Sequence, residues 1–111
     1  MLSMIYIGAL LTTPVMAQRH KMEVLRNLIC DNVRRAAQVN WLSKQLGRPM
    51  RTTVPSGSEN IAPLYRWAFD YGYNQATSEE DAVMMARAKC MDNVDRLVQD
   101  DIAGRTVAPL R

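Results

Sequence analysis

The stretch that decides the fold is residues 77–98, TSEEDAVMMARAKCMDNVDRLV. Thr77 and Glu80 have the spacing of a capping box, and the acidic residues around them favour the positive end of a helix. Apolar side chains then recur every three or four residues, which indicates one buried helix face: Val83, Ala86, Cys90, Val94 and Leu97. We therefore expect a helix over about residues 79–101, ended by Gly104.

An earlier segment has the same periodicity and contains the other cysteine, Cys30. Its apolar stripe is Met22, Leu25, Ile29, Val33 and Ala36. Gly47 is a natural left-handed stop, and a proline follows it two positions later. The pattern predicts a helix over about residues 19–46, with Cys30 on its wide apolar face.

Between these two helices lies the aromatic segment, residues 61–76, IAPLYRWAFDYGYNQA. Its five rings alternate in the sequence, so a strand would place all of them on one face. A helix would split them into a first row of Tyr65, Phe69 and Tyr73 and a second row of Trp67 and Tyr71. We predict a helix, because Asn60 can cap it, Pro63 falls in the first turn, and no second strand-like run offers a partner. Gly72 either permits a close approach between helices or marks an early helix end.

The remaining segments have no apolar period. Residues 47–60 are rich in proline, glycine and hydroxyl residues, which predicts a loop. This loop contains Arg48 and Arg51 and no acidic residue before Glu59. We expect residues 104–111 to form a frayed tail.

The two cysteines predict one disulfide between the first and third helices. Such a bond would close a loop of about 60 residues, which the chain-entropy model values at about 4 kcal/mol. The rival interpretation is a metal pair, but two cysteines and the single His20 do not supply the four ligands of a structural zinc site. The sequence thus predicts an all-α, small three-helix domain with one disulfide, and it suggests no metal or cofactor.

Residues 1–17, MLSMIYIGALLTTPVMA, have the features of a cleavable signal peptide. An uncharged apolar run is ended by Pro14, and Val15 and Ala17 fit the positions before a signal-peptidase site, although no Lys or Arg precedes the run. The alternative is an uncleaved anchor, but the run is shorter than the roughly 20 residues that span a bilayer. We expect residues 18–111 to be a single domain, periplasmic or secreted, without a later transmembrane segment.

Charge is unevenly distributed along the chain. Residues 18–66 hold nine Lys and Arg against three Asp and Glu, whereas residues 67–111 hold five against eight. One interpretation is that the two halves attract each other within the domain. The other is a basic face for an acidic partner, which after export would be a protein or an anionic envelope component and not nucleic acid.

The candidate binding residues are those of the aromatic segment and the basic loop. A helix in a three-helix domain cannot bury both rows of rings, and exposed Trp and Tyr are the residue types that anchor interfaces. The alternative is that one row packs in the core while the other covers the surface. The proposed partner-binding set is Trp67, Tyr71, Tyr65, Phe69, Tyr73, Arg48 and Arg51. No nucleophile and base have a telling spacing, so we do not expect an enzyme.

These features predict a non-enzymatic envelope protein that acts by binding another macromolecule. In outline the chain resembles the small periplasmic acid-stress chaperones of the HdeA type, because residues 18–111 read as a short helical domain in which Cys30 and Cys90 join distant helices. That resemblance implies a stress chaperone as one alternative. A small hydrolase or effector with an unrecognised site is the other alternative.

Overall fold

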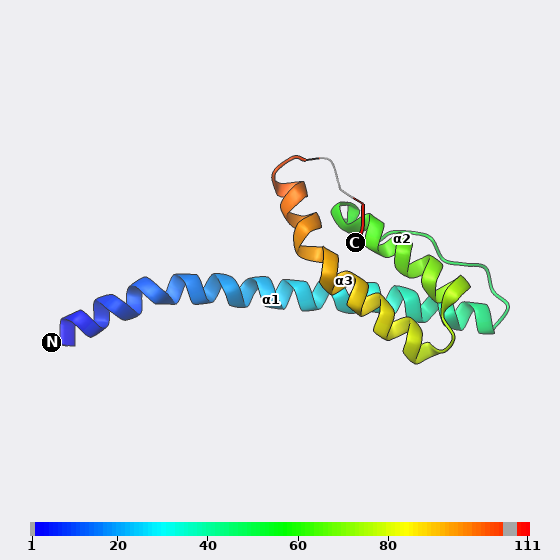
Figure 1. Cartoon of the computed structure of the whole chain (residues 1–111), viewed down its shortest axis with the longest axis horizontal. Helices are drawn as coiled ribbons and strands as arrows, with labels where there is room; N and C mark the ends of the chain where they lie inside the picture. Colours follow the sequence, from blue (N-terminus) through cyan, green and yellow to red (C-terminus); the bar gives the residue numbers. More distant parts are fainter. Residues whose placement is uncertain (1, 106–108) are drawn as a thin grey trace.

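The structure is a computed structural model that describes residues 2–105 and 109–111, with side chains described from Arg19 onward. All regular secondary structure in this part is helical: α1 (Leu2–Gln45), the 3-10 turn η1 (Glu59–Ile61), α2 (Ala62–Asp70), the π-helical turn η2 (Tyr71–Gln75) and α3 (Glu79–Ile102). Figure 1 shows α3 crossing α1, with α2 near the C-terminal half of α1. The prediction of an all-α domain with three helices is confirmed for the described residues.

α1 begins earlier than expected. It starts at Leu2 and continues through Pro14, where we expected a break. The fixed φ of proline lies in the helical range, so the backbone can stay helical at this position. The side chains around Ala17 lie outside the described part of the structure, and cleavage of the chain after Ala17 stays a prediction.

Two glycines end the long helices as the sequence predicts. Gly47 and Gly104 both have φ of 68°, a left-handed conformation that glycine adopts without a Cβ clash. After α1, Arg48 N–H donates to Ser43 O at 2.8 Å, and after α3, Arg105 N–H donates to Asp100 O at 2.9 Å. These bonds satisfy carbonyls that each helix end would otherwise leave unpaired.

The start of α3 is capped one residue later than we expected from the sequence. Ser78 is the N-cap residue, and its hydroxyl accepts a hydrogen bond from Asp81 N–H at 3.0 Å. The Asp81 carboxylate accepts in return from Thr77 N–H at 3.0 Å. Ser78 therefore caps α3 through Asp81 N–H, while the Asp81 carboxylate bonds the residue before the cap, Thr77. The predicted pairing of Thr77 with Glu80 is wrong because Ser78 takes the extended cap conformation.

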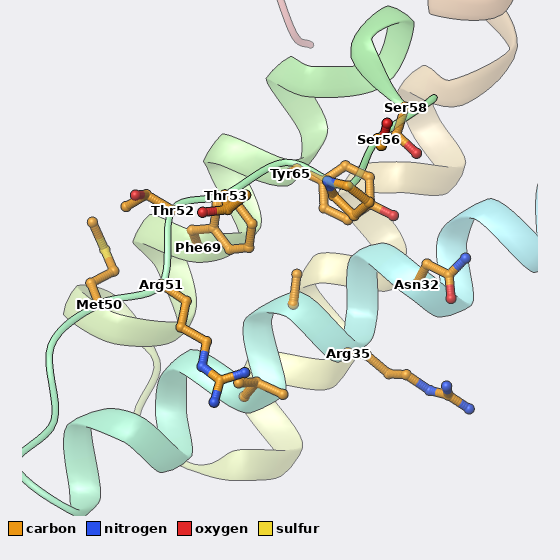
Figure 2. A pocket seen from close by; sticks show the side chains of 13 residues that line it. Asn32, Arg35, Met50, Arg51, Thr52, Thr53, Ser56, Ser58, Tyr65 and Phe69 are labelled. Carbon is orange, nitrogen blue, oxygen red and sulfur yellow. The ribbon is translucent and has the colours of Figure 1, made fainter.

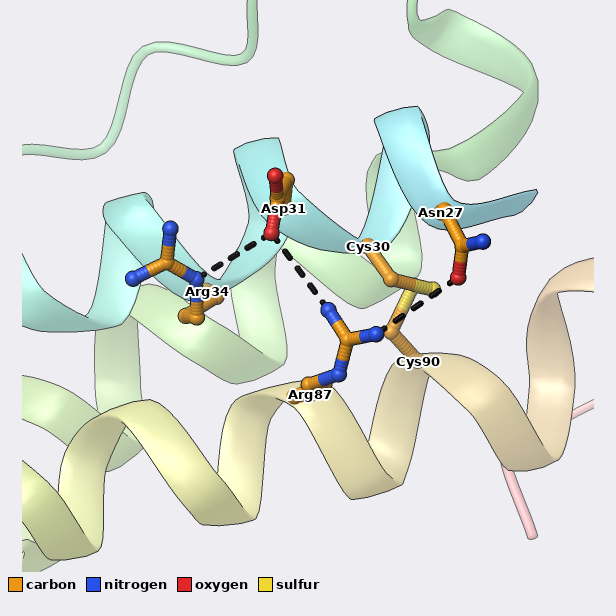
Figure 3. A network of polar contacts seen from close by, with 6 residues as sticks. All are labelled: Asn27, Cys30, Asp31, Arg34, Arg87 and Cys90. Atoms are coloured by element: carbon orange, nitrogen blue, oxygen red, sulfur yellow. Dashed lines mark hydrogen bonds and ion pairs between the residues drawn. A yellow bond between two sulfur atoms is a disulfide. The ribbon is translucent and has the colours of Figure 1, made fainter. Parts of the chain in front are cut away.

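The predicted disulfide joins α1 to α3. Cys30 and Cys90 are bonded, and neither cysteine is exposed to solvent. Beside the bond, Arg87 donates to Asp31 at 3.4 Å, and Figure 3 shows Arg87 bridging to α1. Two further polar contacts join α1 to α3 on either side of the bond, Arg26 to Asp95 at 3.0 Å and Gln38 to Glu79 at 2.6 Å.

The buried stripe of α3 agrees with the prediction except at Val83, which is half-buried while Ala82 is buried, and the stripe of α1 agrees only in part. Val33 and Cys30 are buried as expected, but Ile29 and Ala36 are only half-buried. The buried residues of α1 are Cys30, Val33, Ala37, Asn40 and Ser43. Met22 and Leu25, which we expected in the core, are 41% and 44% exposed. The expectation is wrong for these two residues, and among the polar contacts of the described residues the first from α1 to α3 is made by Arg26. The earlier part of α1 projects beyond the bundle (Figure 1).

The aromatic segment is helical, but its start differs from the prediction. Pro63 lies in the first turn of α2, as expected. Asn60 is not the cap, because it lies inside η1, which leads directly into α2 without a side-chain cap. The helix then widens into the π-helical turn η2, in which Ala76 N–H donates to Tyr71 O at 2.8 Å.

The end of the chain is docked on α3. Pro109 O accepts from Arg96 at 2.8 Å, and Arg111 N–H donates to Asn93 at 2.8 Å. Leu110 is half-buried and packs against the core. The prediction of a frayed tail over 104–111 is therefore wrong for residues 109–111, because the buried Asn93 side chain offers an acceptor there; residues 106–108 lie outside the described residues.

Gly72 permits the close approach that was one of its two interpretations. A Cβ at this position would lie 2.8 Å from the carbonyl carbon of Ala37 and closer still to its oxygen. Both neighbouring atoms are backbone, so no flexible side chain can move aside. The absence of a side chain at Gly72 therefore sets how near η2 lies to α1.

Replacing Gly72 by Ala should destabilise the protein by about 3 kcal/mol, because the new methyl overlaps the α1 backbone. In an uncrowded helix the same change stabilises by about 1 kcal/mol, so the sign of the effect is diagnostic. Urea unfolding measures it, with Gly57→Ala as control: no atom lies near that position, and only its positive φ of 85° is strained. A Gly72→Ala variant as stable as the parent would contradict the close approach.

Candidate functional site

A groove of about 860 Å³ lies between α1, the loop after α1 and α2 (Figure 2). α1 contributes one wall: Asn32, Arg35, Ala36 and Val39. The loop contributes the opposite wall: Met50, Arg51, Thr52, Thr53, Pro55, Ser56 and Ser58. Tyr65 and Phe69 of α2 complete the lining. We call this hollow the loop groove.

The loop groove is basic and rich in hydroxyl groups. Arg35 comes from α1 and Arg51 from the loop, and no Asp or Glu belongs to the described lining. Within residues 19–105 and 109–111, neither guanidinium group has an ion pair or a hydrogen-bond partner. Two unneutralised cations that face one hollow favour an anionic ligand, and guanidinium groups match carboxylates or phosphates in two-point hydrogen bonds.

A buried asparagine holds the loop in place. Asn40 has no exposed surface, and its amide is fully used by the backbone around it. Its side chain accepts from Arg51 N–H at 2.9 Å and donates to Arg51 O at 2.8 Å. It also donates to Phe69 O at 3.1 Å, so a single side chain on α1 ties together the loop and α2.

Two more contacts fix the course of the loop. The Tyr73 hydroxyl donates to Arg48 O at 2.8 Å, and the Lys44 ammonium lies 4.8 Å from the centre of the Tyr73 ring. Val54 is half-buried and packs against the core. The loop is therefore held at three successive points, Arg48, Arg51 and Val54. These contacts form one wall of the loop groove before any ligand binds.

The first row of rings lies in the core beneath the loop groove. Tyr65 and Phe69 are 3% and 7% exposed, and their ring centres are 6.0 Å apart. Burial raises the pKa of the Tyr65 phenol, an effect that a hydrogen bond with Ser58 partly opposes. The phenol is therefore neutral at physiological pH, and its hydroxyl is a hydrogen-bonding group of the lining.

The second row of rings faces α3. Trp67 and Tyr71 are half-buried and stacked, with ring centres 4.9 Å apart and planes inclined by 9°. The Lys89 ammonium lies 5.3 Å from the centre of the Trp67 ring. The Tyr71 hydroxyl donates to Asp81 at 2.9 Å. These contacts give both rings partners within the domain.

The loop groove thus brings together only part of the set of residues proposed from the sequence. Arg51, Tyr65 and Phe69 line it. Arg48 and Tyr73 bond to each other beside it, while Trp67 and Tyr71 lie against α3. That any of these residues contacts a partner stays a prediction.

Sequence reasoning missed Arg35 and Asn40. Asn40 could have been found, because it follows Val33 and Ala37 at helical spacing and so places an amide on the buried stripe of α1. A polar side chain at such a position requires buried partners. No feature of the sequence around Arg35 marks it as a site residue, because it lines the groove only where the loop folds back beside α1.

The described residues contain no cluster of His, Cys, Asp and Glu side chains that could hold a metal ion. None of the helices in the searched part of the chain combines the length and the apolar character needed to cross a bilayer. No protein-family model, no curated protein and no solved structure matches the chain.

Replacing Asn40 by Ala should lower the free energy of unfolding by about 2–4 kcal/mol, because it removes the three hydrogen bonds that this side chain makes to the backbone of Arg51 and Phe69. Hydrogen exchange at the Arg51 amide should accelerate by a larger factor than the loss of unfolding free energy alone would cause. The matched control is Asn32→Ala, which removes an exposed amide from the same helix and should change stability by at most about 0.5 kcal/mol. Unchanged protection at Arg51 would contradict the assigned role of Asn40.

The bonds at Asp81 predict a specific loss of stability in acid. Hydrogen bonds from Thr77 N–H and Tyr71 hold the pKa of the Asp81 carboxyl below its usual value. Its contribution to stability is therefore complete above the unfolded pKa of about 3.9 and is lost as the pH falls through the lower, folded pKa. Asp81→Asn should be less stable than the parent at pH 7, with the difference shrinking below about pH 4.

Urea midpoints of the parent and of Asp81→Asn at pH 7 and pH 3 measure this loss, and Tyr71→Phe should show a smaller loss because it removes one donor. A difference of the same size at both pH values would contradict the role of the ionised carboxylate.

Proposed function

We propose that this chain is a small exported, non-enzymatic protein of the cell envelope that binds an anionic region of another macromolecule in the loop groove. The observation that carries this proposal is the pair of guanidinium groups, Arg35 and Arg51, on opposite walls of a preformed hollow without a described carboxylate in its lining. Such a hollow attracts negative charge and offers it two-point hydrogen bonds.

The composition of the lining favours binding over catalysis. The groove has several hydroxyl groups, but no His, Cys, Asp or Glu among its described lining residues could act as a base beside them. A hydroxyl nucleophile needs such a base or a metal to be activated. The proposal therefore gives the serines and threonines of the loop the role of hydrogen-bonding groups.

An envelope location is supported by two independent features. A buried disulfide is typical of proteins that fold in an oxidising compartment. Residues 1–17 have the apolar run and the small-residue site of an export signal.

A specific observation also favours the alternative of a stress chaperone. The first part of α1 exposes four large apolar side chains, which could hold unfolded clients: Met22, Val24, Leu25 and Leu28. This surface lies on α1 before Cys30, whereas the α1 wall of the loop groove begins at Asn32, so an experiment can separate the two functions.

Site-specific photocrosslinking in the native envelope tests the proposal. The full chain, expressed with residues 1–17, would have benzoylphenylalanine in place of Thr53 in the groove or Leu28 on α1. We expect a discrete adduct from position 53, and we expect the double change Arg35→Glu and Arg51→Glu to abolish it. The intact mass of the recovered chain should correspond to residues 18–111.

Arg66→Glu is the control, because Arg66 is exposed, lies outside the groove lining and changes net charge in the same way. No adduct at position 53, or an adduct that survives charge reversal of the groove, would overturn the proposed function. Adducts that form only at position 28, and only in acid or heat, would instead support the chaperone.

A further inference from the structure

The wall of the loop groove contains an unpaired stretch of backbone. Between Arg48 and Pro55 the chain forms neither helix nor turn. Within the described residues, no hydrogen bond involves the main-chain N–H or C=O groups of Thr52, Thr53 and Val54. The loop is nevertheless held firmly on one side of this stretch, where both polar backbone groups of Arg51 bond to the buried Asn40.

A fixed, unpaired segment beside a hollow is the requirement for recognising another extended chain. A peptide that lies alongside such a segment gains main-chain hydrogen bonds, and its alternate side chains point into the hollow and away from it. Pro55 has no N–H group, so it ends the available pairing at Val54. Because the segment is already held by α1 and the core, binding costs little ordering of the loop.

Charge determines which peptides fit. Arg35 comes from α1 and Arg51 from the loop, their guanidinium groups lie apart from each other (Figure 2), and neither has an anionic partner among the described residues. Carboxylate side chains of an extended peptide would provide the missing negative charge. The apolar part of the lining, which includes Ala36, Val39 and Met50, would accept apolar side chains at other positions.

The aromatic rings argue against a carbohydrate. Sugar rings commonly stack on exposed aromatic faces, but Tyr65 and Phe69 are almost completely buried beneath the groove. A flat membrane surface fits poorly too, because the two arginines line a hollow and not a protruding surface.

We infer that the loop groove binds an acidic, extended segment of a partner protein, which pairs its backbone with Thr52–Val54 and places carboxylates against Arg35 and Arg51. This inference rests on the proposed binding function and specifies the partner that the function requires.

Selection from a display library of random decapeptides tests the inference directly. The selected sequences should be enriched in Asp and Glu alternating with apolar residues. A synthetic peptide of the leading sequence should bind the full chain saturably in fluorescence anisotropy. The double change Arg35→Ala and Arg51→Ala should weaken it about tenfold or more, whereas Arg66→Ala should leave affinity nearly unchanged.

Backbone pairing has its own test. Methylating alternate backbone nitrogens of the selected peptide removes main-chain donors and keeps every side chain, so affinity should fall about tenfold. Selection of acid-free sequences, or equal binding of the methylated peptide, would overturn the inference. So would the absence of enrichment over a library panned without protein.

A failure of the inference is distinguishable from a failure of the proposed function. Vesicles with anionic phospholipid and an anionic polysaccharide are assayed with the same variants. If either binds in an Arg35- and Arg51-dependent manner while no peptide is selected, the groove binds anions but its occupant is not a peptide. If position 53 also fails to crosslink in the envelope, the proposed function fails as well.

Discussion

The bond between Cys30 and Cys90 joins two helices that are 60 positions apart in sequence, and the packing of the domain depends on it. Among the described residues, the fully buried side chains include only two leucines, Leu64 and Leu97, and several buried residues of α1 and α3 are small: Cys30, Ala37, Ala82, Ala86 and Cys90. Small residues let helices approach closely, but they bury little apolar surface. A covalent link supplies the stability that so thin a core lacks, because it restricts the unfolded chain.

Once α1 and α3 are fixed, the position of the aromatic segment follows. α2 and η2 reach α1 only because Gly72 presents no side chain to the Ala37 backbone. The same approach brings Phe69 O within reach of Asn40, which also holds the loop at Arg51. The loop groove is thus a secondary product of helix packing: its wall is placed by one glycine and one buried amide, neither of which lines it.

Much of the helical framework could be predicted from the sequence, because local signals encode it. The glycine stops at Gly47 and Gly104, the stripe of α3 and the pairing of the cysteines depend on residues near in sequence or on the cysteine count alone. The stripe of α1 was misassigned because an exposed helix can be as apolar as a buried one. Met22 is exposed and Val33 is buried because the other helices cover α1 at Val33 and do not reach as far as Met22.

The candidate site was harder to predict for the same physical reason. Arg51, Tyr65 and Phe69 belonged to segments singled out from the sequence, but Arg35 joins them only because the loop folds back along α1. Trp67 and Tyr71 looked like exposed anchors, yet α3 supplies them with Lys89 and Asp81 as partners. Contacts between segments far apart in sequence determine both the place of Arg35 and the burial of the two rings. The periodicity of a single segment carries no information about such contacts.

The measurement that tests this account most directly is residue-resolved hydrogen exchange of the oxidised and the fully reduced chain. If the disulfide organises the domain, reduction should cost about 4 kcal/mol of stability and should remove protection together from α1, α3 and the Arg51 amide. A reduced chain that keeps the protection of Arg51 and α2 would contradict the account, because the loop groove would then form without the bond.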